Sequence, residues 1–299
     1  MTQLTPDQRG QFDRDGYLIL PGVFSADEIR RMRTEADYIL ELILNSSLAN
    51  KRRSGRLDWQ RLPDGRQIVR KIQPINDLSL YLSRISADPR LLDPMRDIMA
   101  DEPVLMEEKL NYKQPLPQPL EGIAVRDTDD RFPIHHDWAY YSAQNYPQNI
   151  LSSAVSMDDS TETSGPIRVW PGTHKTFLEH EPCDIGLQVK PGLLDPNAHT
   201  SILAPAGSVM IFHSLLVHDS RPNTSGKPRR LMIYSHYPAK ANMGFDVRNG
   251  PGRLTEAPWE RQYLRMKEAG VYKDQFHAPK VPGYENAGNF WTPAEGKTG

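Results

Sequence analysis

Residues 132–141, Phe132-Pro-Ile-His-His-Asp-Trp-Ala-Tyr-Tyr141, carry two histidines and a carboxylate at three consecutive positions. Successive side chains of an extended strand project from opposite faces, so His135 and Asp137 are expected on one face. His136 points away from them. This spacing can therefore supply an imidazole nitrogen and a carboxylate oxygen as two adjacent ligands of one metal ion.

A second histidine-bearing strand lies downstream at residues 210–218, Met-Ile-Phe-His-Ser-Leu-Leu-Val-His. Either His213 or His218 could complete a site with His135 and Asp137. Two histidines and one carboxylate on one face, with the other coordination positions open, form the arrangement that proteins use for iron(II) that activates oxygen. An H-x-D triplet alone is a weak signal, so the surrounding sequence decides how much weight it carries.

Short β-type runs separated by Gly, Pro, Asn and Ser surround these two segments. We expect strands at residues 104–112, 150–157, 167–170, 208–213 and 231–237. Such a succession, with no intervening helices, favours an antiparallel double-sheet barrel over a parallel sheet. The predicted fold is α+β but mainly β: a jelly roll, or cupin-like double-stranded β-helix, with N-terminal helices beside it.

The N-terminal part of the chain is predicted to be mostly helical. Thr5 is a suitable helix start, and residues 17–20, Tyr-Leu-Ile-Leu, form a short buried-strand candidate. Ser25 and Glu28 make a capping box, after which apolar residues recur at helical spacing. A further amphipathic helix is expected over residues 89–99.

We expect residues 1–299 to form a single domain, with its jelly-roll core over about residues 103–240. No repeat at a fixed period and no low-complexity segment is present. The last stretch, residues 241–299, contains one helix candidate and then a run rich in Pro and Gly, so it is predicted to be a lid or a wrapping segment.

The composition excludes several classes of protein. With 36 basic and 38 acidic side chains, the net charge of -2 provides no overall field that would attract nucleic acid or an anionic membrane. No apolar stretch approaches the roughly 18 residues needed to cross a bilayer, and the polar N-terminus lacks the apolar core of a secretory signal. We therefore expect a cytoplasmic protein with no nucleic-acid or membrane partner. The sequence does not indicate its oligomeric state.

Two compositional details bear on ligands. Cys183 is the one cysteine of the chain, so an internal disulfide and a thiolate cluster are both excluded, and any metal must be bound by nitrogen and oxygen. Residues 51–56 contain four basic side chains, and Arg70 and Lys71 follow before the expected barrel. These cations could meet an anionic group, but a solvated loop is the favoured interpretation.

The segment from His218 to Arg230, His-Asp-Ser-Arg-Pro-Asn-Thr-Ser-Gly-Lys-Pro-Arg-Arg, resembles the distal half of the phytanoyl-CoA hydroxylase-like family of iron and 2-oxoglutarate dioxygenases. In that family an arginine eleven positions after the distal histidine grips the far carboxylate of 2-oxoglutarate. Here that residue is Arg229, whose planar guanidinium can hold a carboxylate through two charge-assisted hydrogen bonds. The resemblance thus implies that His218, and not His213, is the second histidine ligand.

The resemblance extends over roughly residues 10–240. Residues 164–175, Ser-Gly-Pro-Ile-Arg-Val-Trp-Pro-Gly-Thr-His-Lys, look like the family's strand and turn between the two metal motifs, and residues 12–29 look like its usual N-terminus. Beyond about residue 237 nothing is recognisable. The ordered motifs together are specific for the superfamily, although each is degenerate when taken alone.

Further site residues follow from the same resemblance. Asn111 and Ser152 match positions that contact the co-substrate in relatives, and Ser220, two residues past His218, could assist Arg229. The alternative is that all three satisfy hydrogen bonds of the barrel. Four aromatic residues close to the site in sequence could line a substrate pocket, with core packing as the alternative: Trp138, Tyr140, Tyr141 and Trp170.

The resemblance implies that the protein binds Fe(II), uses 2-oxoglutarate and O2, releases succinate and CO2, and oxidises a C–H bond of a small-molecule substrate. Asp137 favours hydroxylation, because halogenating relatives carry a small residue at this position; desaturation, cyclisation and epimerisation use the same ligands. The sequence does not name the substrate, and a small molecule of secondary metabolism is our preferred interpretation. Two rivals are a non-catalytic jelly-roll module that binds metal or ligand, and a zinc hydrolase built on the same ligands.

Overall fold

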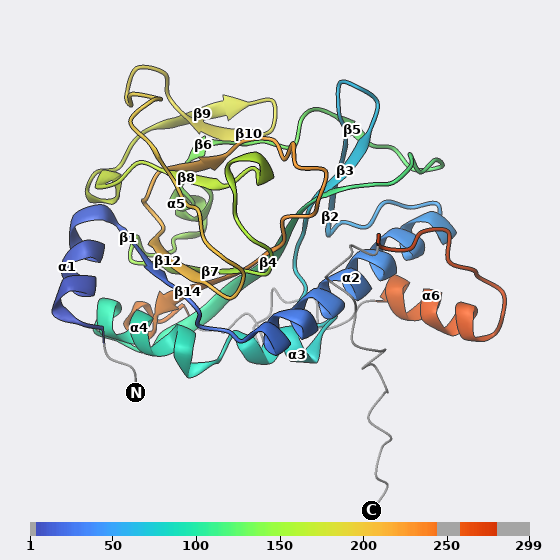
Figure 1. The fold of residues 1–299 in the computed structure, drawn as a ribbon, viewed down its shortest axis with the longest axis horizontal. Helices are drawn as coiled ribbons and strands as arrows, with labels where there is room; N and C mark the ends of the chain where they lie inside the picture. The colour runs from blue at the N-terminus through green and yellow to red at the C-terminus, as the bar shows by residue number, and fades with distance from the viewer. Residues whose placement is uncertain (1–3, 244–257, 280–299) are drawn as a thin grey trace, which may run out of the picture.

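The computed structural model describes residues 4–243 and 258–279, which form two facing β-sheets with helices on the outer side of the larger one (Figure 1). In spatial order the larger sheet contains β1 (Tyr17–Leu20), β12 (Val209–His213), β7 (Leu151–Ser156), β14 (Leu231–Pro238), β4 (Pro103–Pro115), β3 (Gln67–Ile72), β2 (Leu57–Arg61) and β5 (Arg126–Asp127). The smaller sheet contains β11 (Thr200–Ser201), β8 (Ile167–Val169), β13 (His218–Ser220) and β6 (Phe132–His135). A separate hairpin is formed by β9 (His180–Cys183) and β10 (Gly186–Val189).

Every neighbouring pair of these strands is antiparallel except β2 and β5. Strand neighbours in space are mostly distant in sequence, as β12 beside β7 and β7 beside β14 illustrate, and this crossing connectivity is typical of a jelly roll. The predicted antiparallel double-sheet core is therefore confirmed. All five strands predicted after residue 103 are present within a few residues of their expected bounds.

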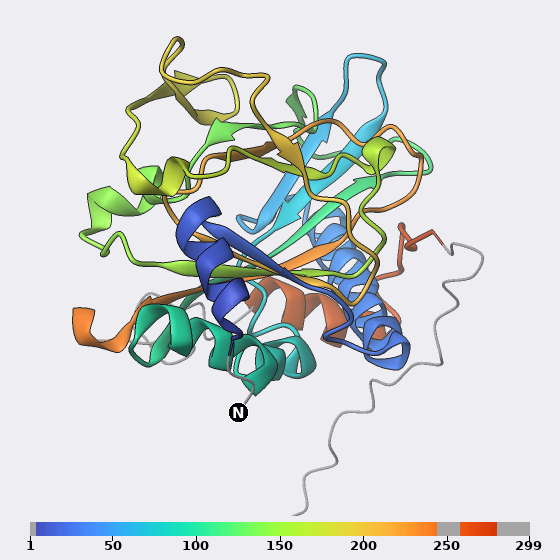
Figure 2. The ribbon, with the colours of Figure 1, turned by 60° about the vertical axis from the view of Figure 1, so that its left-hand side comes forward.

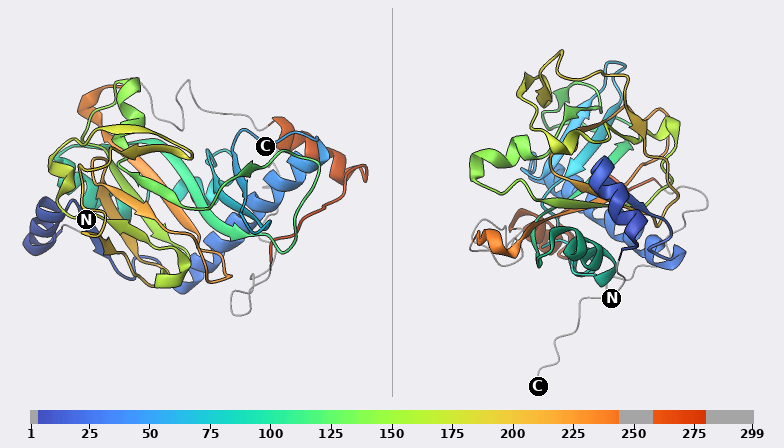
Figure 3. Two further views of the ribbon diagram at one scale, coloured as in Figure 1. Left: turned by 90° about the horizontal axis from the view of Figure 1, so that it is seen from above. Right: turned by 90° about the vertical axis from the view of Figure 1, so that its left-hand side faces the viewer.

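The helices lie mainly on one side of the core, so the molecule is layered as small sheet, large sheet and helices (Figures 2 and 3). They are α1 (Pro6–Asp15), α2 (Ala26–Ala49), α3 (Leu80–Ile85), α4 (Pro89–Met99), the single turn α5 (Trp138–Tyr141) and α6 (Pro258–Glu268), with 3-10 turns η1 (Ser142–Gln144), η2 (Glu162–Ser164), η3 (Thr173–Lys175) and η4 (Ala239–Ala241).

The helix boundaries follow from local chemistry. Thr5 and Ser25 both form complete capping boxes, so the backbone N–H groups at the starts of α1 and α2 find acceptors. Gly16 ends α1 in the left-handed region at φ 82°, where a side chain would also collide with His174.

The main hydrophobic core lies between the larger sheet and α2, α3 and α4. Buried apolar residues of α2 face the sheet, and two strand tyrosines cross the interface with their hydroxyl groups. Tyr112 donates to the carbonyl of Ala36 at 2.7 Å, and Tyr234 donates to the carbonyl of Leu82 at 2.6 Å. These bonds let the tyrosines fill the core without leaving a buried hydroxyl unpaired. The helices therefore cover one face of the larger sheet, and the opposite face, which is turned toward the smaller sheet, is available to line a cavity.

The strands β2 and β3 differ from the prediction, because they precede residue 103 and yet belong to the larger sheet. Their sequences, Leu-Asp-Trp-Gln-Arg and Gln-Ile-Val-Arg-Lys-Ile, interleave charged with apolar residues, so their period is hard to recognise. The solvated-loop interpretation is wrong for Arg70 and Lys71, which lie on β3, with Arg70 buried against Asp58. It is also wrong for Arg56, which is buried and bonds Asp77 through both terminal nitrogens.

The described part of the C-terminal segment packs against α2 on the far side of the larger sheet (Figure 1). Asn45 of α2 accepts the backbone N–H groups of Gln275 and Phe276 and donates to the carbonyl of Phe276. Residues 244–257 and 280–299 lie outside the described residues, so most of the predicted lid or wrapping segment does too. Among the helices that the structure describes, none combines the length and the apolar character that a membrane crossing requires.

Candidate active site

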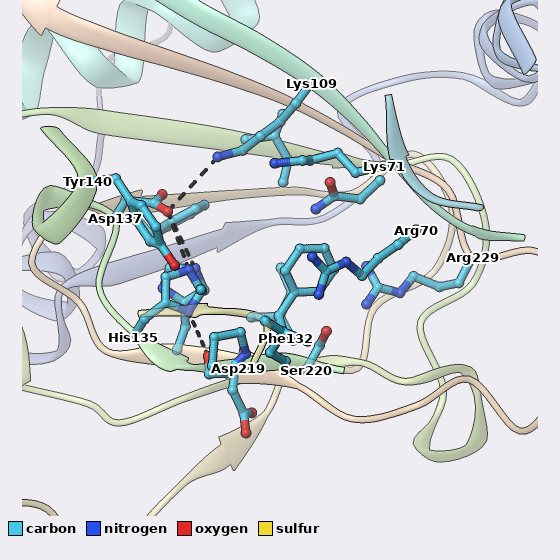
Figure 4. A pocket seen from close by; sticks show the side chains of 18 residues that line it. Arg70, Lys71, Lys109, Phe132, His135, Asp137, Tyr140, Asp219, Ser220 and Arg229 are labelled. Atoms are coloured by element: carbon cyan, nitrogen blue, oxygen red, sulfur yellow. Dashed lines mark hydrogen bonds and ion pairs between the residues drawn. The ribbon is translucent and has the colours of Figure 1, made fainter. Parts of the chain in front are cut away.

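The side chains of His135, Asp137 and His218 converge on one point. Figure 4 shows two of them, His135 and Asp137, in the pocket. Strands β6 and β13 are antiparallel, and His135 and His218 are direct partners in their register. Nε2 of His135 and Nε2 of His218 lie 3.7 Å and 3.9 Å from Oδ1 of Asp137. One potential ligand atom from each residue lies within 4.8 Å of the other two, which is the separation expected for three ligands of one ion.

Asp137 is positioned by a turn, and not by the alternation of side chains along a strand. Strand β6 ends at His135, and Asp137 has helical backbone angles, φ -62° and ψ -33°, at the start of α5. His136 turns away as predicted: its Nε2 donates to the carbonyl of Leu178 at 3.1 Å, and its Nδ1 accepts from the N–H of Ala139. The spacing of His135 and Asp137 therefore predicts the right pair of side chains, but a turn, and not an extended strand, brings them together.

His213 lies at the end of β12, outside the group of three convergent residues. Its Nδ1 accepts the N–H of Leu215 at 3.1 Å, and its ring lies against that of His174. Of the two downstream histidines that the sequence left open, His218 is the one that the structure brings to His135 and Asp137.

Hydrogen bonds to backbone carbonyls fix the orientation of both convergent imidazoles. Nδ1 of His135 donates to the carbonyl of Pro133 at 2.6 Å, and Nδ1 of His218 donates to that of Leu216 at 3.0 Å. Because a carbonyl can only accept, each Nε2 carries a free lone pair. Burial and the neighbouring His135 lower the pKa of His218 to about 4, so this ring is neutral near pH 7. His218 is thus in the form that binds a metal, and one ligand atom of each ring faces the site.

Burial favours the neutral form of Asp137, but the ammonium group of Lys109, whose Nζ lies 3.9 Å from Oδ1, opposes it, and the pKa of the carboxyl group is lowered. Asp137 is therefore a carboxylate at neutral pH. Its Oδ1 faces the two histidines, while its Oδ2 is buried and finds no hydrogen-bond donor among the described residues. A carboxylate with a buried, unused oxygen beside two imidazole side chains is a donor set that suits a divalent cation.

The three convergent residues line a cavity of about 190 Å³ between the sheets (Figure 4). Both sheets and the β9–β10 hairpin contribute to its walls. The lining residues are Arg70, Lys71, Lys109, Asn111, Phe132, Pro133, His135, Asp137, Tyr140, Ile167, Ile185, Gly186, Phe212, His218, Asp219, Ser220, Arg229 and Ile233.

Arg229 reaches this cavity from the residues just before β14 and is 1% exposed. One terminal nitrogen donates to the carbonyl of Gly165, while its Nε has no acceptor among the described residues, and no ion pair is formed there. Burial lowers its pKa to about 10, although Asp130 and Asp158 oppose the effect, so the side chain remains a cation. A buried cation without an anion is costly, which suggests that a ligand carboxylate completes it.

Two polar side chains of the cavity wall also have a buried atom without a hydrogen-bond partner among the described residues. Oγ of Ser220 and Oδ1 of Asn111 are buried and form no hydrogen bond within the described residues. Asn111 lies beside Lys71 of β3 on one side and beside Leu231, two residues after Arg229, on the other. The candidate co-substrate residues Arg229, Ser220 and Asn111 therefore line one cavity with the convergent triad.

The other sequence candidates divide between the cavity and the core. Tyr140 lines the cavity, and its hydroxyl accepts the N–H of Leu187 at 2.9 Å. Ser152, Trp138, Tyr141 and Trp170 are not among the described residues that line it. Ser152 bonds Ser235 across two strands, and the others bond Tyr146, Glu107 and Asp195.

The sequence does not single out Lys109 as a cavity residue, and it favours a solvated loop for Lys71. A β-bulge explains Lys71, because the register of β3 shifts between Val69 and Lys71 and both Arg70 and Lys71 then face the cavity. Lys71 forms no hydrogen bond or ion pair with the described residues, and burial together with nearby Lys109 lowers its pKa. Charged residues inside otherwise apolar strands were the available signal for both lysines.

Comparison with known proteins agrees with this geometry. Residues 12–231 match the family model described as phytanoyl-CoA dioxygenase (PhyH). The chain is 28% identical to the ectoine dioxygenase of Sphingopyxis alaskensis over 268 residues, which cover 80% of this chain and 78% of that protein. It is 22% identical to L-proline trans-4-hydroxylase of Streptomyces griseoviridis over 252 residues, which cover 77% and 85%.

Solved structures show the same fold. The crystal structure of EctD from S. alaskensis with 2-oxoglutarate and 5-hydroxyectoine superposes with a TM-score of 0.59 at 24% identity, covering 80% of this chain and 77% of that one. The epimerase SnoN in complex with Fe3+, alpha ketoglutarate and nogalamycin RO superposes with a TM-score of 0.58 at 18% identity, covering 82% and 90%. The jelly-roll prediction is thereby confirmed.

Proposed function

The chain belongs to the phytanoyl-CoA dioxygenase (PhyH) family, and from this membership we propose that it is an iron(II)- and 2-oxoglutarate-dependent dioxygenase that hydroxylates a C–H bond of a small organic molecule. One observation carries the proposal. Three potential ligands and Arg229 line the same cavity, and among the described residues Oδ2 of Asp137 and Nε of Arg229 are buried there without a hydrogen-bond partner.

His135 and His218 would bind the metal through Nε2, and Asp137 through its carboxylate. When bound, iron(II) supplies the activation of O2 that is coupled to decarboxylation of 2-oxoglutarate to succinate and CO2. The chain's own contribution is orientation. The carbonyls of Pro133 and Leu216 hold the two rings, and a facial set of three ligands leaves coordination positions open.

Arg229 would hold the far carboxylate of 2-oxoglutarate, with the hydroxyl of Ser220 beside it. Asn111 and Lys71 extend the same wall, and Lys71 adds a second unpaired cation toward a dianionic co-substrate. Among the residues that the structure describes, the other cations of the wall are already matched by acids: Arg70 by Asp58 and Lys109 by Glu107. This difference supports the assignment of Arg229 and Lys71 to the co-substrate.

The apolar part of the cavity would exclude water and receive the substrate's C–H bond. Phe212 and Ile233 come from the larger sheet, Phe132 and Ile167 from the smaller sheet, and Ile185 from the β9–β10 hairpin. A small cavity with apolar walls and a few convergent polar groups suits a small-molecule substrate. Ectoine and L-proline are the first substrates to test, because two relatives are named for their oxidation.

The test compares the two histidines of the β12–β13 region. Anaerobic addition of Fe(II), ascorbate and 2-oxoglutarate to the wild-type protein is expected to give a weak visible charge-transfer band. His218→Ala should abolish it, whereas the matched variant His213→Ala should retain it. With O2 and a substrate panel, succinate should form only when 2-oxoglutarate is present. A wild-type protein without the band, or one with zinc-supported hydrolysis that does not need 2-oxoglutarate, contradicts the proposal.

Two further expectations rest on the sequence. The cytosolic location is a prediction that fractionation of the source cells would test. The assignment of residues 1–299 to a single domain is a second prediction, for which limited proteolysis followed by mass spectrometry is the measurement.

A further inference from the structure

A lysine stands beside the carboxylate of the metal site. Nζ of Lys109, on β4, lies 3.9 Å from Oδ1 of Asp137, the same oxygen that faces His135 and His218 (Figure 4). The lysine side chain lines the cavity and is 14% exposed. A positive charge therefore lies next to the atom that would bind the metal.

Glu107, two residues earlier on β4, holds this lysine in place. Its Oε1 lies 2.9 Å from Nζ of Lys109 and accepts the hydroxyl of Tyr141 at 2.5 Å, and its Oε2 accepts the amide of Gln73 at 2.8 Å. Tyr141 belongs to α5, which begins directly after Asp137. The carboxylate of Glu107 is thus anchored from two other segments, and the lysine is fixed through it.

The pair carries no net charge, but its two ends are not equivalent toward the metal site. Lys109 is within 4 Å of Asp137, whereas among the described residues Glu107 forms its ion pair with Lys109 and not with the site itself. Lys71 is a further cation of the same cavity wall, and Tyr140 is a neutral polar residue of that wall. In a poorly solvated cavity, removing one member of the pair would leave a whole unbalanced charge close to the ion.

We propose that Glu107 and Lys109 form a positioning pair that orients Asp137 and sets the affinity of the site for divalent metal, with Lys109 weakening metal binding and Glu107 offsetting it. The inference rests on the proposed function, since it assumes that Asp137 is a metal ligand. It goes beyond that function because neither residue needs to touch the metal or the co-substrate. Both act through the Asp137 carboxylate.

The two single variants are predicted to have opposite effects on metal affinity. Lys109→Met removes the cation and leaves the negative charge of Glu107, so Co(II) or Mn(II) should bind about tenfold more tightly by calorimetry. Glu107→Gln leaves the cation unbalanced, so binding should weaken about tenfold. The double variant restores neutrality and should lie within about threefold of the wild type. A merely structural role would weaken binding in every variant.

A spectroscopic readout accompanies the binding data. With Fe(II) and 2-oxoglutarate bound, the charge-transfer band should move to lower energy in Lys109→Met, because Asp137 becomes a stronger donor, and to higher energy in Glu107→Gln. Lys190→Met is the matched control, because Lys190 pairs with Glu179 at 2.6 Å on the surface, and it should change neither readout.

The outcomes separate this inference from the proposed function. A wild-type protein that binds no divalent metal overturns both. A wild-type protein that binds metal, with both single variants weaker or both unchanged, overturns the pair and leaves the function standing. If Lys109→Met does not fold, Glu107→Gln and the double variant decide: weaker binding in the first and recovery in the second supports the pair, and any other result refutes it.

Discussion

Arg229 and Arg230 are consecutive, both are buried, and they have opposite surroundings. Arg230 donates to both oxygens of Asp158 at 2.9 Å and to Asp37 of α2 at 2.6 Å, and its backbone N–H also donates to Asp158. Arg229 faces the cavity, where one carbonyl is its acceptor in the described part of the chain and its Nε has none. Among the described residues, Arg230 therefore has carboxylate partners and Arg229 has none.

Their protonation equilibria differ in the same sense. Burial lowers the pKa of both guanidinium groups, but Asp158 and Asp37 more than offset it for Arg230, whose pKa is raised. For Arg229 the nearby Asp130 and Asp158 offset the effect of burial only in part, and its pKa falls to about 10. A paired buried charge connects secondary-structure elements, here α2 with the larger sheet, whereas an unpaired one is retained for a ligand. Two adjacent arginines therefore have different roles: Arg230 stabilises the fold, and Arg229 is available to bind a ligand.

The largest predicted effect is on stability, at Arg230. Arg230→Met leaves Asp37 buried without a cation and leaves Asp158 paired with Arg33 alone, which should lower the free energy of unfolding by about 3–5 kcal/mol. Urea denaturation followed by circular dichroism measures it. A loss below about 1 kcal/mol would contradict the structural role, and the fraction that remains folded should still bind 2-oxoglutarate.

Arg229→Met should show the opposite pattern. Two charge-assisted hydrogen bonds to the co-substrate, each contributing about 1.5 kcal/mol, are lost, so the Kd of 2-oxoglutarate should rise about hundredfold. Stability without ligand should be equal or higher, since an unpaired buried charge has been removed. Titration of the charge-transfer band and a urea curve give the two values. Unchanged co-substrate affinity would show that the cavity does not use this arginine.

Lys71→Met is expected to produce a smaller change of the same kind. An ammonium group is a point charge without the planar fork of a guanidinium, so loss of this cation should weaken 2-oxoglutarate binding about fivefold, or about 1 kcal/mol. Because Lys71 has no ion pair with the described residues, stability should change little. Lys51→Met, an exposed lysine of the preceding loop, is the control. A loss of affinity equal to that of Arg229→Met would make Lys71 the principal anchor.

The sequence predicted those parts of the molecule that depend on local patterns. The capping box at Ser25 and the strand at residues 17–20 are confirmed, because capping and alternation act over a few residues. The convergence of His135 with His218 needed the family's spacing in addition, since residues 83 positions apart meet through the register of β6 and β13. Their role as ligands stays a prediction.

The parts that sequence could not give depend on long-range pairing. The position of Lys71 in the cavity requires β3 beside β4 and a bulge at Arg70, and neither is encoded in the residues around it. The family's spacing singles out Arg229, but the residues around the two arginines do not show that Arg230 is paired and Arg229 is not. Their difference arises because Asp37 and Asp158, remote in sequence, are brought to one of the two arginines and not to the other.

The smallest predicted effect is on stability, and it tests whether an ion pair at the surface stabilises the fold as the buried pairs of Arg230 do. Glu28 caps α2 and pairs with Arg90 at 2.7 Å, and this hydrogen-bonded pairing lowers the pKa of Glu28 to about 2 against the opposing effect of burial. Because the folded-state pKa lies below the unfolded one, the stabilisation is present above about pH 4.5 and is lost as the pH falls toward 2. Both side chains are about one-third exposed, so solvent limits the contribution to about 0.5–1 kcal/mol.

The difference in unfolding free energy between wild type and Glu28→Gln should therefore be constant from pH 7 to 5 and shrink below that range. A difference independent of pH would mean that the capping hydrogen bond, and not the charge, stabilises the start of α2.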